Sequence, residues 1–189
     1  MGTAPFFYGG GMNSDLLTSL VRTIPDFPKP GIQFRDITTL LADAKGLREL
    51  VRAMADIARP LDPDLIVGVE ARGFILGAVL AYELDAGFVP VRKAGKLPGK
   101  TVGIDYVLEY GTDRLELHEG QVPKSSRVIL IDDLIATGGT AIAAAQLLRE
   151  QGADLLLALF AIDLPDLGGR VALEKEGVPV QTIIAFEGH

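Results

Sequence analysis

Two adjacent carboxylates, Asp132 and Asp133, follow an apolar run and precede a loop rich in threonine and glycine; the segment reads VILIDDLIATGGTA over 128–141. Ionised carboxylates only accept hydrogen bonds, so an adjacent pair suits the vicinal hydroxyls of a sugar. The apolar run predicts a buried strand, and the residues after the loop predict a helix, whose first N–H groups attract anions. The pattern indicates a site for a ribose phosphate, with the sugar on the acids and the phosphate on the loop.

The candidate phosphate loop consists of five consecutive residues: Ala136, Thr137, Gly138, Gly139 and Thr140. Glycine allows backbone conformations and close approaches that a side chain blocks, and the threonine hydroxyls add donors. The segment is not a Walker A loop, because the Gly-Lys-Ser/Thr ending is missing, and no G-x-G-x-x-G fingerprint of a dinucleotide site follows a strand. The alternative interpretation is an ordinary helix start after a strand, with solvated acids.

Basic residues follow two other apolar runs. Arg72 comes shortly after the run 65–69, and Arg92 with Lys93 follows the run 88–91. Ligands of open parallel sheets bind beyond the carboxyl ends of the strands, so these residues join the acid pair as candidates. Arg72 precedes a predicted helix, where the helix dipole disfavours a cation, and this favours a working role. Composition alone explains Arg92 and Lys93 better as solvated surface charges.

The order of the apolar runs predicts an α/β fold. Short apolar runs, typical of buried strands, alternate with stretches of helical spacing. This alternation is typical of a central parallel sheet flanked by helices, because parallel strands need long crossovers and are buried on both faces. The predicted strands are 65–69, 88–91, 127–131, 155–162 and 180–186, and the predicted helices are 43–59, 73–84 and 140–151, with a short one from Ser14.

Three segments depart from this alternation. Residues 1–12 mix glycine and aromatic residues without a period and are predicted as a loose arm. Three prolines over 24–36 exclude a helix and a central strand, which predicts a stiff loop. Alternating apolar residues over 93–124, interrupted at Gly111, predict a protruding hairpin. Because no linker is visible, residues 1–189 are predicted to form one domain.

Composition excludes several classes of function. The chain has 189 residues, a mass of 20.1 kDa and 48% hydrophobic residues, which suits one soluble domain with a sizeable core. Its net charge of -7 argues against a nucleic-acid partner. Cysteine is absent, which excludes disulfides, thiolate nucleophiles and sulfur-ligated zinc. The longest apolar run, 155–162, is far shorter than the roughly 20 residues of a membrane span, so a cytoplasmic protein with no membrane partner is expected.

The acids and the loop, Ile131-Asp132-Asp133 through Thr137-Gly138-Gly139-Thr140, resemble the signature of the type I phosphoribosyltransferases. Four further segments, in the same order and spacing, resemble the adenine-using branch of that family. They are PDFPKPGIQFRDIT (25–38), VEARGFILG (69–77), VRKAGKLPG (91–99) and LEYGTDRLELHEG (108–120). The resemblance extends over 24–187, and several separate motifs in order argue strongly against chance agreement.

This resemblance implies transfer of phosphoribose from phosphoribosyl pyrophosphate to adenine, giving AMP and pyrophosphate in purine salvage. It implies the type I phosphoribosyltransferase fold, with a small hood and a flexible β-hairpin flap, in a homodimer. It also implies Mg²⁺, an ion that prefers oxygen ligands and keeps its waters, so we expect the substrate rather than the protein to carry most of its shell.

The leaving pyrophosphate is strongly negative, and cations must neutralise it as its bond to ribose breaks. Arg72, Arg92, Lys93 and Lys96 are the candidates, with Arg72 also assigned to catalysis. In the family, the loop that corresponds to AGKLPG reaches across a dimer interface, so the resemblance implies that Lys96 serves the neighbouring subunit's site.

The resemblance also assigns the flap and the base pocket. Glu109 and Tyr110 lie at a glycine turn, where an ordinary exposed turn is the simpler local interpretation. The family pattern implies instead that Glu109 handles a purine proton and that Tyr110 helps the flap exclude water. Gln33, Phe34 and Arg35 would face adenine, although the family often has a small apolar residue in place of Gln33. Core packing is the alternative for Phe34.

Other functions share parts of this pattern. Phosphoribosyltransferases for xanthine, guanine, hypoxanthine or orotate would carry the same signature, but the PDFP segment argues against them. A non-catalytic sensor of phosphoribosyl pyrophosphate would keep the loop, but it would not need Glu109, Arg72 and Lys96. A transcriptional regulator would add a basic DNA-binding module, and no such face is visible in this acidic sequence.

Overall fold

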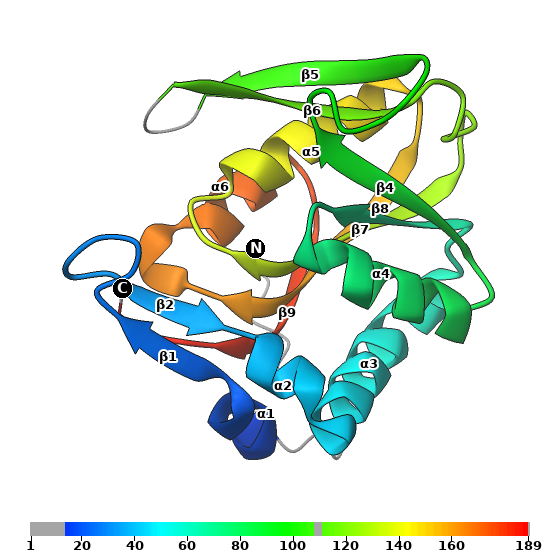
Figure 1. Cartoon of the computed structure of the whole chain (residues 1–189). Coiled ribbons are helices and arrows are strands. Elements are labelled where there is room, and N and C mark those ends of the chain that lie inside the picture. The colour runs from blue at the N-terminus through cyan, green and yellow to red at the C-terminus, as the bar shows by residue number, and fades with distance from the viewer. Residues whose placement is uncertain (1–13, 108–110, 189) are drawn as a thin grey trace.

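The computed structural model describes residues 14–107 and 111–188. The predicted loose arm, 1–12, therefore lies outside the described residues. The elements in chain order (Figure 1) are α1 (Ser14–Leu20), β1 (Arg22–Pro25), β2 (Gln33–Asp36), α2 (Thr38–Ala42), α3 (Ala44–Ala58), the 3-10 turn η1 (Arg59–Leu61), β3 (Leu65–Val69), α4 (Arg72–Glu83), β4 (Gly87–Lys93), β5 (Thr101–Val107), β6 (Thr112–His118), β7 (Arg127–Ile135), α5 (Gly139–Glu150), β8 (Asp154–Asp163), the 3-10 turn η2 (Pro165–Leu167), α6 (Gly169–Lys175) and β9 (Val180–Ala185).

A seven-stranded sheet in the order β5-β6-β4-β3-β7-β8-β9 forms the centre of the fold. Strands β4, β3, β7, β8 and β9 run parallel, and β6 and β5 continue the sheet antiparallel beyond β4. This confirms the predicted class, a central and mostly parallel sheet flanked by helices. None of the helices in the described part of the chain is long and apolar enough to cross a bilayer.

Two hydrophobic clusters cover the two faces of the sheet. Ile129 and Ile131 of β7 join the cluster under α3 and α4, whereas Val128 and Leu130 join the cluster under α5 and α6. Successive side chains of a strand point to opposite faces, so a strand buried on both sides must be apolar throughout. This explains why the apolar run of β7 is continuous, and it fixes the direction in which the residues after the run point.

The helix predicted over 43–59 is confirmed as α3, and its start is specified by one side chain. The Asp43 carboxylate accepts the backbone N–H of Gly46 at 2.7 Å, which satisfies one of the unpaired donors at the helix start. Four short helical segments were not predicted: α2, η1, η2 and α6, none longer than seven residues. Segments this short carry too few turns to display a helical period.

The hairpin predicted to protrude over 93–124 is instead part of the main sheet. β6 pairs with the end of β4 through Arg92 opposite Glu116 and Lys93 opposite Leu115. The apolar face of β5, including Ile104, packs onto the cluster under α5. The hairpin strands therefore lie over α5 (Figure 1). Alternation predicted the two strands correctly, but the pairing with β4 is non-local and has no sequence signal.

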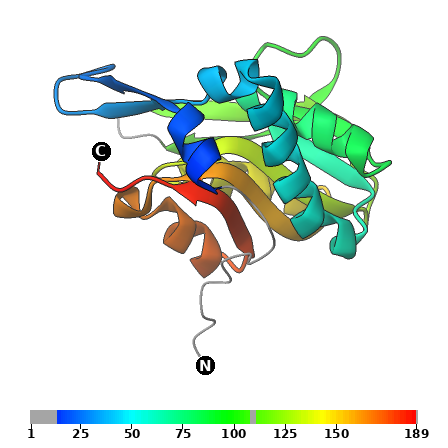
Figure 2. The ribbon, with the colours of Figure 1, turned by 90° about the horizontal axis from the view of Figure 1, so that it is seen from below.

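The proline-rich segment 24–36 lies outside the central sheet, as predicted, but it is not only a loop. Its two ends form an antiparallel ribbon of β1 and β2, with Arg22 opposite Asp36. The ribbon extends beyond the layers of the fold beside the C-terminal segment (Figure 2), and it forms the small hood that the resemblance implied.

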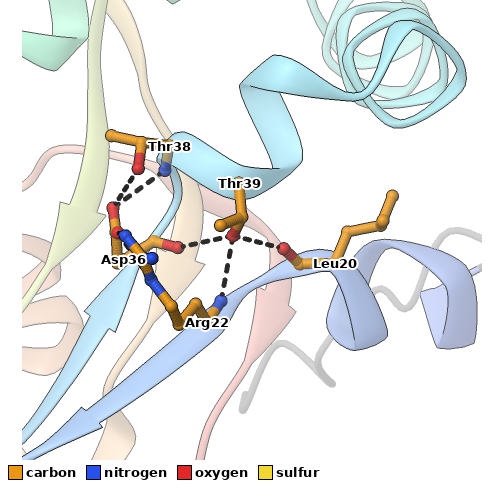
Figure 3. Close-up of polar contacts among 5 residues, drawn as sticks. All are labelled: Leu20, Arg22, Asp36, Thr38 and Thr39. Carbon is orange, nitrogen blue, oxygen red and sulfur yellow. Dashed lines mark hydrogen bonds and ion pairs between the residues drawn. The ribbon is translucent and has the colours of Figure 1, made fainter.

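Asp36 fixes the base of this hood. The carboxylate accepts the N–H and the hydroxyl of Thr38 at 3.0 and 2.7 Å and forms an ion pair with Arg22 (Figure 3). Beside it, the Thr39 hydroxyl donates to the Leu20 carbonyl at 2.6 Å and accepts the Arg22 N–H at 3.2 Å. One buried carboxylate thus links β1, β2 and α2, while the Thr39 hydroxyl adds the end of α1.

This arrangement predicts a pH-dependent contribution to stability. The hydrogen bonds from Thr38 and the Arg22 guanidinium lower the pKa of Asp36 from 3.8 to about 2. A carboxyl with a depressed native pKa stabilises the fold above its unfolded pKa, and this stabilisation is lost as the pH falls from about 4 towards 2. We expect Asp36→Asn to lower the free energy of unfolding by about 2 kcal/mol at pH 7, and by progressively less below pH 4.

Urea unfolding at several pH values between 7 and 3 measures this difference. Asp85→Asn, in the exposed turn after α4, is the matched control and should follow the wild type throughout. A deficit of Asp36→Asn that stays constant down to pH 3 would contradict the role of the charge.

Candidate functional site

A cleft of about 700 Å³ opens at the carboxyl end of β7. It is lined by Arg72, Val107, the residues from Asp132 to Ile142, and Phe160. The end of one central strand, the loop after it, the start of α5 and the start of α4 therefore meet at a single site. Volumes of this size suit small-molecule ligands. The predicted acid pair, the predicted phosphate loop and Arg72 are brought together here.

The two acids lie inside β7 rather than after it, because β8 continues to pair with β7 as far as Ile135 opposite Asp163. Their side chains therefore point to opposite faces. Asp133 is 3% exposed and forms an ion pair with Arg72. Asp132 lines the cleft, and its Oδ1 accepts the N–H of Asp133 at 2.8 Å. Both acids line the cleft, but Asp133 is buried against the arginine whereas Asp132 is partly exposed.

The electrostatics of this group favour a positively charged or proton-donating ligand. Burial and the neighbouring Asp133 charge raise the pKa of Asp132 well above its ordinary value. Burial is the largest single effect on Arg72 and opposes its charge, but the hydrogen bond and the charge of Asp133, together with two further carboxylate charges, raise the pKa of Arg72. These two charges belong to Asp132 and Asp36. A hydroxyl or a cation beside Asp132 would relieve the repulsion between the acids.

The phosphate loop is held in place by a residue that the sequence did not single out. Gly138 adopts φ 87°, and α5 begins at the next residue. The N–H of Gly169 donates to the Ala136 carbonyl at 2.9 Å. A Cβ atom at Gly138 would lie 2.9 Å from the Gly169 carbonyl oxygen. The loop backbone therefore packs directly against the start of α6, and we call this contact the clasp. In the sequence, only the two adjacent glycines, 168 and 169, could have indicated such a close backbone contact.

Arg92 and Lys93 lie beside the cleft but do not line it. Arg92 donates to the Glu70 carboxylate at 3.0 Å, and the backbone N–H of Lys93 donates to the same oxygen at 3.2 Å. The Lys93 ammonium is 3.1 Å from an Asp113 carboxylate oxygen. Lys96 is exposed in the following turn, where its carbonyl accepts an N–H of Arg92 at 3.0 Å. Glu70 thus organises the basic cluster at the end of β4.

The three residues predicted to face adenine lie on β2. Alternation along the strand sends Gln33 and Arg35 to one face of the ribbon and Phe34 to the other. Phe34 makes an edge-to-face contact with Phe27 at 5.3 Å between ring centroids. Arg35 donates to the Thr23 hydroxyl at 2.6 Å, and its guanidinium lies 4.7 Å from the centre of the Phe186 ring. Arg35 therefore contacts β1 and the C-terminal segment.

The two flap residues, Glu109 and Tyr110, fall within 108–110 and so lie outside the described residues. The preceding residue, Val107, is 78% exposed and lines the cleft. Val107 and the buried Phe160 are further lining residues that the sequence did not indicate. Both are apolar residues within strands, and a cleft-lining apolar residue of a strand cannot be distinguished from a core residue by pattern.

Carboxylate oxygens are the ligand atoms that this site offers to a metal. Among residues 14–107 and 111–188, no group of three or more histidine, cysteine, aspartate or glutamate side chains is placed to hold an ion. The Asp132 carboxylate, repelled by its neighbour and facing the cleft, is the oxygen donor that a Mg²⁺ brought in by a phosphorylated sugar would meet. The donor set therefore fits an ion that the substrate helps to hold.

Comparison with known proteins agrees with this geometry. Residues 36–167 match the model of the phosphoribosyl transferase domain. The chain is 63% identical over 172 residues to an adenine phosphoribosyltransferase of Sphingopyxis alaskensis, covering 91% of this chain and 94% of the relative. The crystal structure of adenine phosphoribosyltransferase from Rhodothermus marinus superposes with a TM-score of 0.86 at 46% identity, covering 92% of this chain and 98% of that one.

A third similar structure carries ligands. It is adenine phosphoribosyltransferase from Saccharomyces cerevisiae, complexed with adenine and an imino-altritol bisphosphate. Its TM-score is 0.85 at 39% identity, with coverage of 90% of this chain and 97% of that one.

Proposed function

Because this chain belongs to the adenine phosphoribosyltransferases of the phosphoribosyl transferase family, we propose that the cleft at the end of β7 is its active site. The protein transfers phosphoribose from phosphoribosyl pyrophosphate to adenine and releases AMP and pyrophosphate. One observation carries the assignment of the site: the acid pair, the loop held by Gly169, and Arg72 all lie around one cavity.

The loop and the acids would hold the two ends of the ribose phosphate. Backbone N–H groups from Ala136 to Thr140, at the start of α5, would bind the 5′-phosphate, with the threonine hydroxyls as further donors. The ribose hydroxyls would donate to Asp132, which faces the cleft. Asp133 is buried and forms an ion pair with Arg72, so its contribution to the site would be to hold Arg72 in place.

The cations would stabilise the leaving group. Arg72 lies at the cleft with its pKa raised, so it stays charged as the bond to pyrophosphate breaks. Arg92 and Lys93 are candidates for the outer phosphate, since their cluster lies at the end of β4. Exposed Lys96 is the candidate to reach a neighbouring subunit's site.

Mg²⁺ remains part of the proposal. When bound with the substrate, it supplies positive charge to the pyrophosphate. Asp132, which lines the cleft, is the carboxylate that would contact it.

The reaction would be a direct displacement that inverts the anomeric carbon through an oxocarbenium-like transition state. Adenine would approach from the hood, where Gln33, Phe34 and Arg35 lie. Glu109 would orient or deprotonate the base, and Tyr110 would help to exclude water. Glu109→Ala with near wild-type turnover would remove Glu109 from this role.

The fold also supports the proposed homodimer. Ile75, Val79 and Tyr82 form an exposed apolar stripe along α4, and Tyr82 is 85% exposed. Residues spaced by three and four share one face of a helix, and a contiguous exposed apolar face marks an interaction site. The stripe lies on the same helix whose first residue is Arg72.

We propose the cytoplasm as the location of the protein.

We expect the wild type to have twice the 20.1 kDa chain mass in light scattering after size exclusion, and Tyr82→Glu to shift it towards the single-chain mass. Charge on the stripe would have to be desolvated in the interface, whereas it costs little on an exposed monomer surface. Val171→Glu on α6, also at an exposed apolar position, is the control and should leave the mass unchanged. A dimeric Tyr82→Glu, or a monomeric wild type, would contradict this assignment.

A base panel tests the proposed function. The purified protein is mixed with phosphoribosyl pyrophosphate, Mg²⁺ and, in turn, adenine, guanine, hypoxanthine, xanthine or orotate, and the pyrophosphate and nucleotide formed are measured. We expect rapid AMP formation with adenine alone. Turnover with another base would overturn the assignment of 33–35 to the base pocket, and binding without turnover on any base would favour a sensor.

A further inference from the structure

One side chain of the hood, Arg35, contacts the segment that follows β9. Its guanidinium lies 4.7 Å from the centre of the Phe186 ring, and it donates to the Glu187 carbonyl at 3.2 Å and to the Gly188 carbonyl at 3.5 Å. A cation over an aromatic face and hydrogen bonds from a charged donor are both favourable. Three successive residues thus hold one arginine, and we call residues 186–188 the C-terminal strap.

The strap is also fixed to the segment that carries the clasp. The N–H of Phe186 donates to the Asp163 carbonyl at the end of β8 at 3.0 Å, and the N–H of Gly188 donates to the Asp166 carboxylate of η2 at 2.8 Å. Two residues after η2, Gly169 begins α6 and forms the clasp. The strap therefore joins the hood to the structural unit that holds the phosphate loop.

The hood depends on such a contact for its orientation. It is a two-stranded sheet of its own, and residues 25–32, which include its turn, are all exposed. An isolated two-stranded ribbon is marginally stable in water, so contacts with other elements must fix its position. The Asp36 carboxylate fixes the base of the ribbon, and the contact of Arg35 with the strap adds a second point along β2.

The nitrogen atoms of Arg35 are engaged within the protein. Nη1 donates to the Thr23 hydroxyl at 2.6 Å, and Nη2 donates to the two strap carbonyls. Nε is buried from solvent. The guanidinium is thus directed at β1 and the strap, so its effect on a ligand would pass through the strand that carries it.

We propose that Arg35 is a positioning residue, which grips the strap and thereby sets the orientation of the hood and the affinity for the base. This inference rests on the proposed function, in which adenine approaches from the hood. The phosphate loop keeps its own contact with Gly169, so loss of the strap contact should weaken the binding of adenine and leave the phosphate site intact.

The test compares the KM for adenine with the KM for phosphoribosyl pyrophosphate in variants on both sides of the contact. Arg35→Met removes the donors, and Phe186→Leu removes the aromatic face but keeps an apolar side chain. Each should raise the KM for adenine about three- to tenfold, with kcat and the other KM within about twofold of the wild type. Adding Phe186→Leu to Arg35→Met should change the KM for adenine less than about 1.5-fold further, because the contact is already lost.

A third variant acts from the other end of the strap. Asp166→Ala removes the acceptor of the Gly188 N–H and leaves every contact of Arg35 in place, so it should raise the KM for adenine about two- to fivefold. Arg52→Met is the matched control, because this arginine lies on α3, is 64% exposed and pairs with Glu49. It should leave both KM values unchanged.

A rise in the KM for adenine that is confined to Arg35→Met would overturn the inference, because Arg35 would then act on the base directly. An unchanged KM for adenine in all three strap variants would overturn it as well, and so would an equal rise in both KM values, which indicates a general loss of structure. Failure of the wild type to form AMP would instead refute the proposed function.

Discussion

Gly169→Ala should lower kcat/KM for phosphoribosyl pyrophosphate by about 100-fold, although Gly169 does not line the cleft. A Cβ atom at this position would lie 2.3 Å from the Ala136 carbonyl oxygen and 2.6 Å from the Gly138 nitrogen. Both atoms belong to backbone, so the phosphate loop itself must move. A misplacement of about 1 Å in a binding loop is enough for a loss of this size. Steady-state kinetics with varied phosphoribosyl pyrophosphate measures the loss.

Gly168→Ala provides the matched control for this prediction. It makes the same chemical change one residue earlier, where a Cβ atom would meet no atom within 4 Å. Gly168 has φ 71°, so alanine should cost about 1 kcal/mol of stability there without moving the loop. Its kcat/KM should stay within about twofold of the wild type. Wild-type kinetics for Gly169→Ala would show that the clasp does not shape the loop.

The second large effect is expected for Arg72→Met, which should reduce kcat by about 10²- to 10³-fold. The substitution removes the cation at the cleft that is placed to stabilise the leaving pyrophosphate. It also leaves Asp133, 3% exposed, without its partner. We expect a loss of about 2–3 kcal/mol in the free energy of unfolding, at the low end for a broken buried pair because the Arg72 side chain is itself 40% exposed.

A second substitution separates the two roles of Arg72. In Arg72→Met with Asp133→Asn, no buried charge is left unpaired, so much of the lost stability should return. The turnover should not return, because the cation is still missing from the cleft. Denaturant unfolding and turnover assays on the wild type, both single variants and the double variant measure the two effects. Recovery of turnover together with stability would show that Arg72 acts only by holding the strand end.

Local patterns in the sequence were sufficient for the parallel strands of the sheet and for half of the site. The continuous apolar run of β7 predicted a doubly covered strand, because only such a strand is apolar on both faces. Asp132, Asp133 and the loop from Ala136 to Thr140 are consecutive, so their proximity in the cleft follows from one strand–loop–helix unit. Residues that a single local unit positions can be placed from sequence.

Features that depend on contacts between distant segments could not be predicted. The contact of Gly169 with Ala136 joins residues 33 apart, and the pairing of Lys93 with Leu115 joins β4 to β6 although β5 lies between them in the sequence. Arg35 was predicted to face adenine from its place in a motif, whereas its hydrogen bond to Thr23 depends on the pairing of β1 with β2. Backbone pairing across loops leaves no period in the sequence.

A crystal structure of the protein with bound AMP tests the central claim most directly. The account predicts that the 5′-phosphate accepts hydrogen bonds from backbone N–H groups between Ala136 and Thr140, and that a ribose hydroxyl donates to Asp132. A phosphate bound instead among Arg92, Lys93 and Lys96, with the loop at the start of α5 free of ligand, would contradict it.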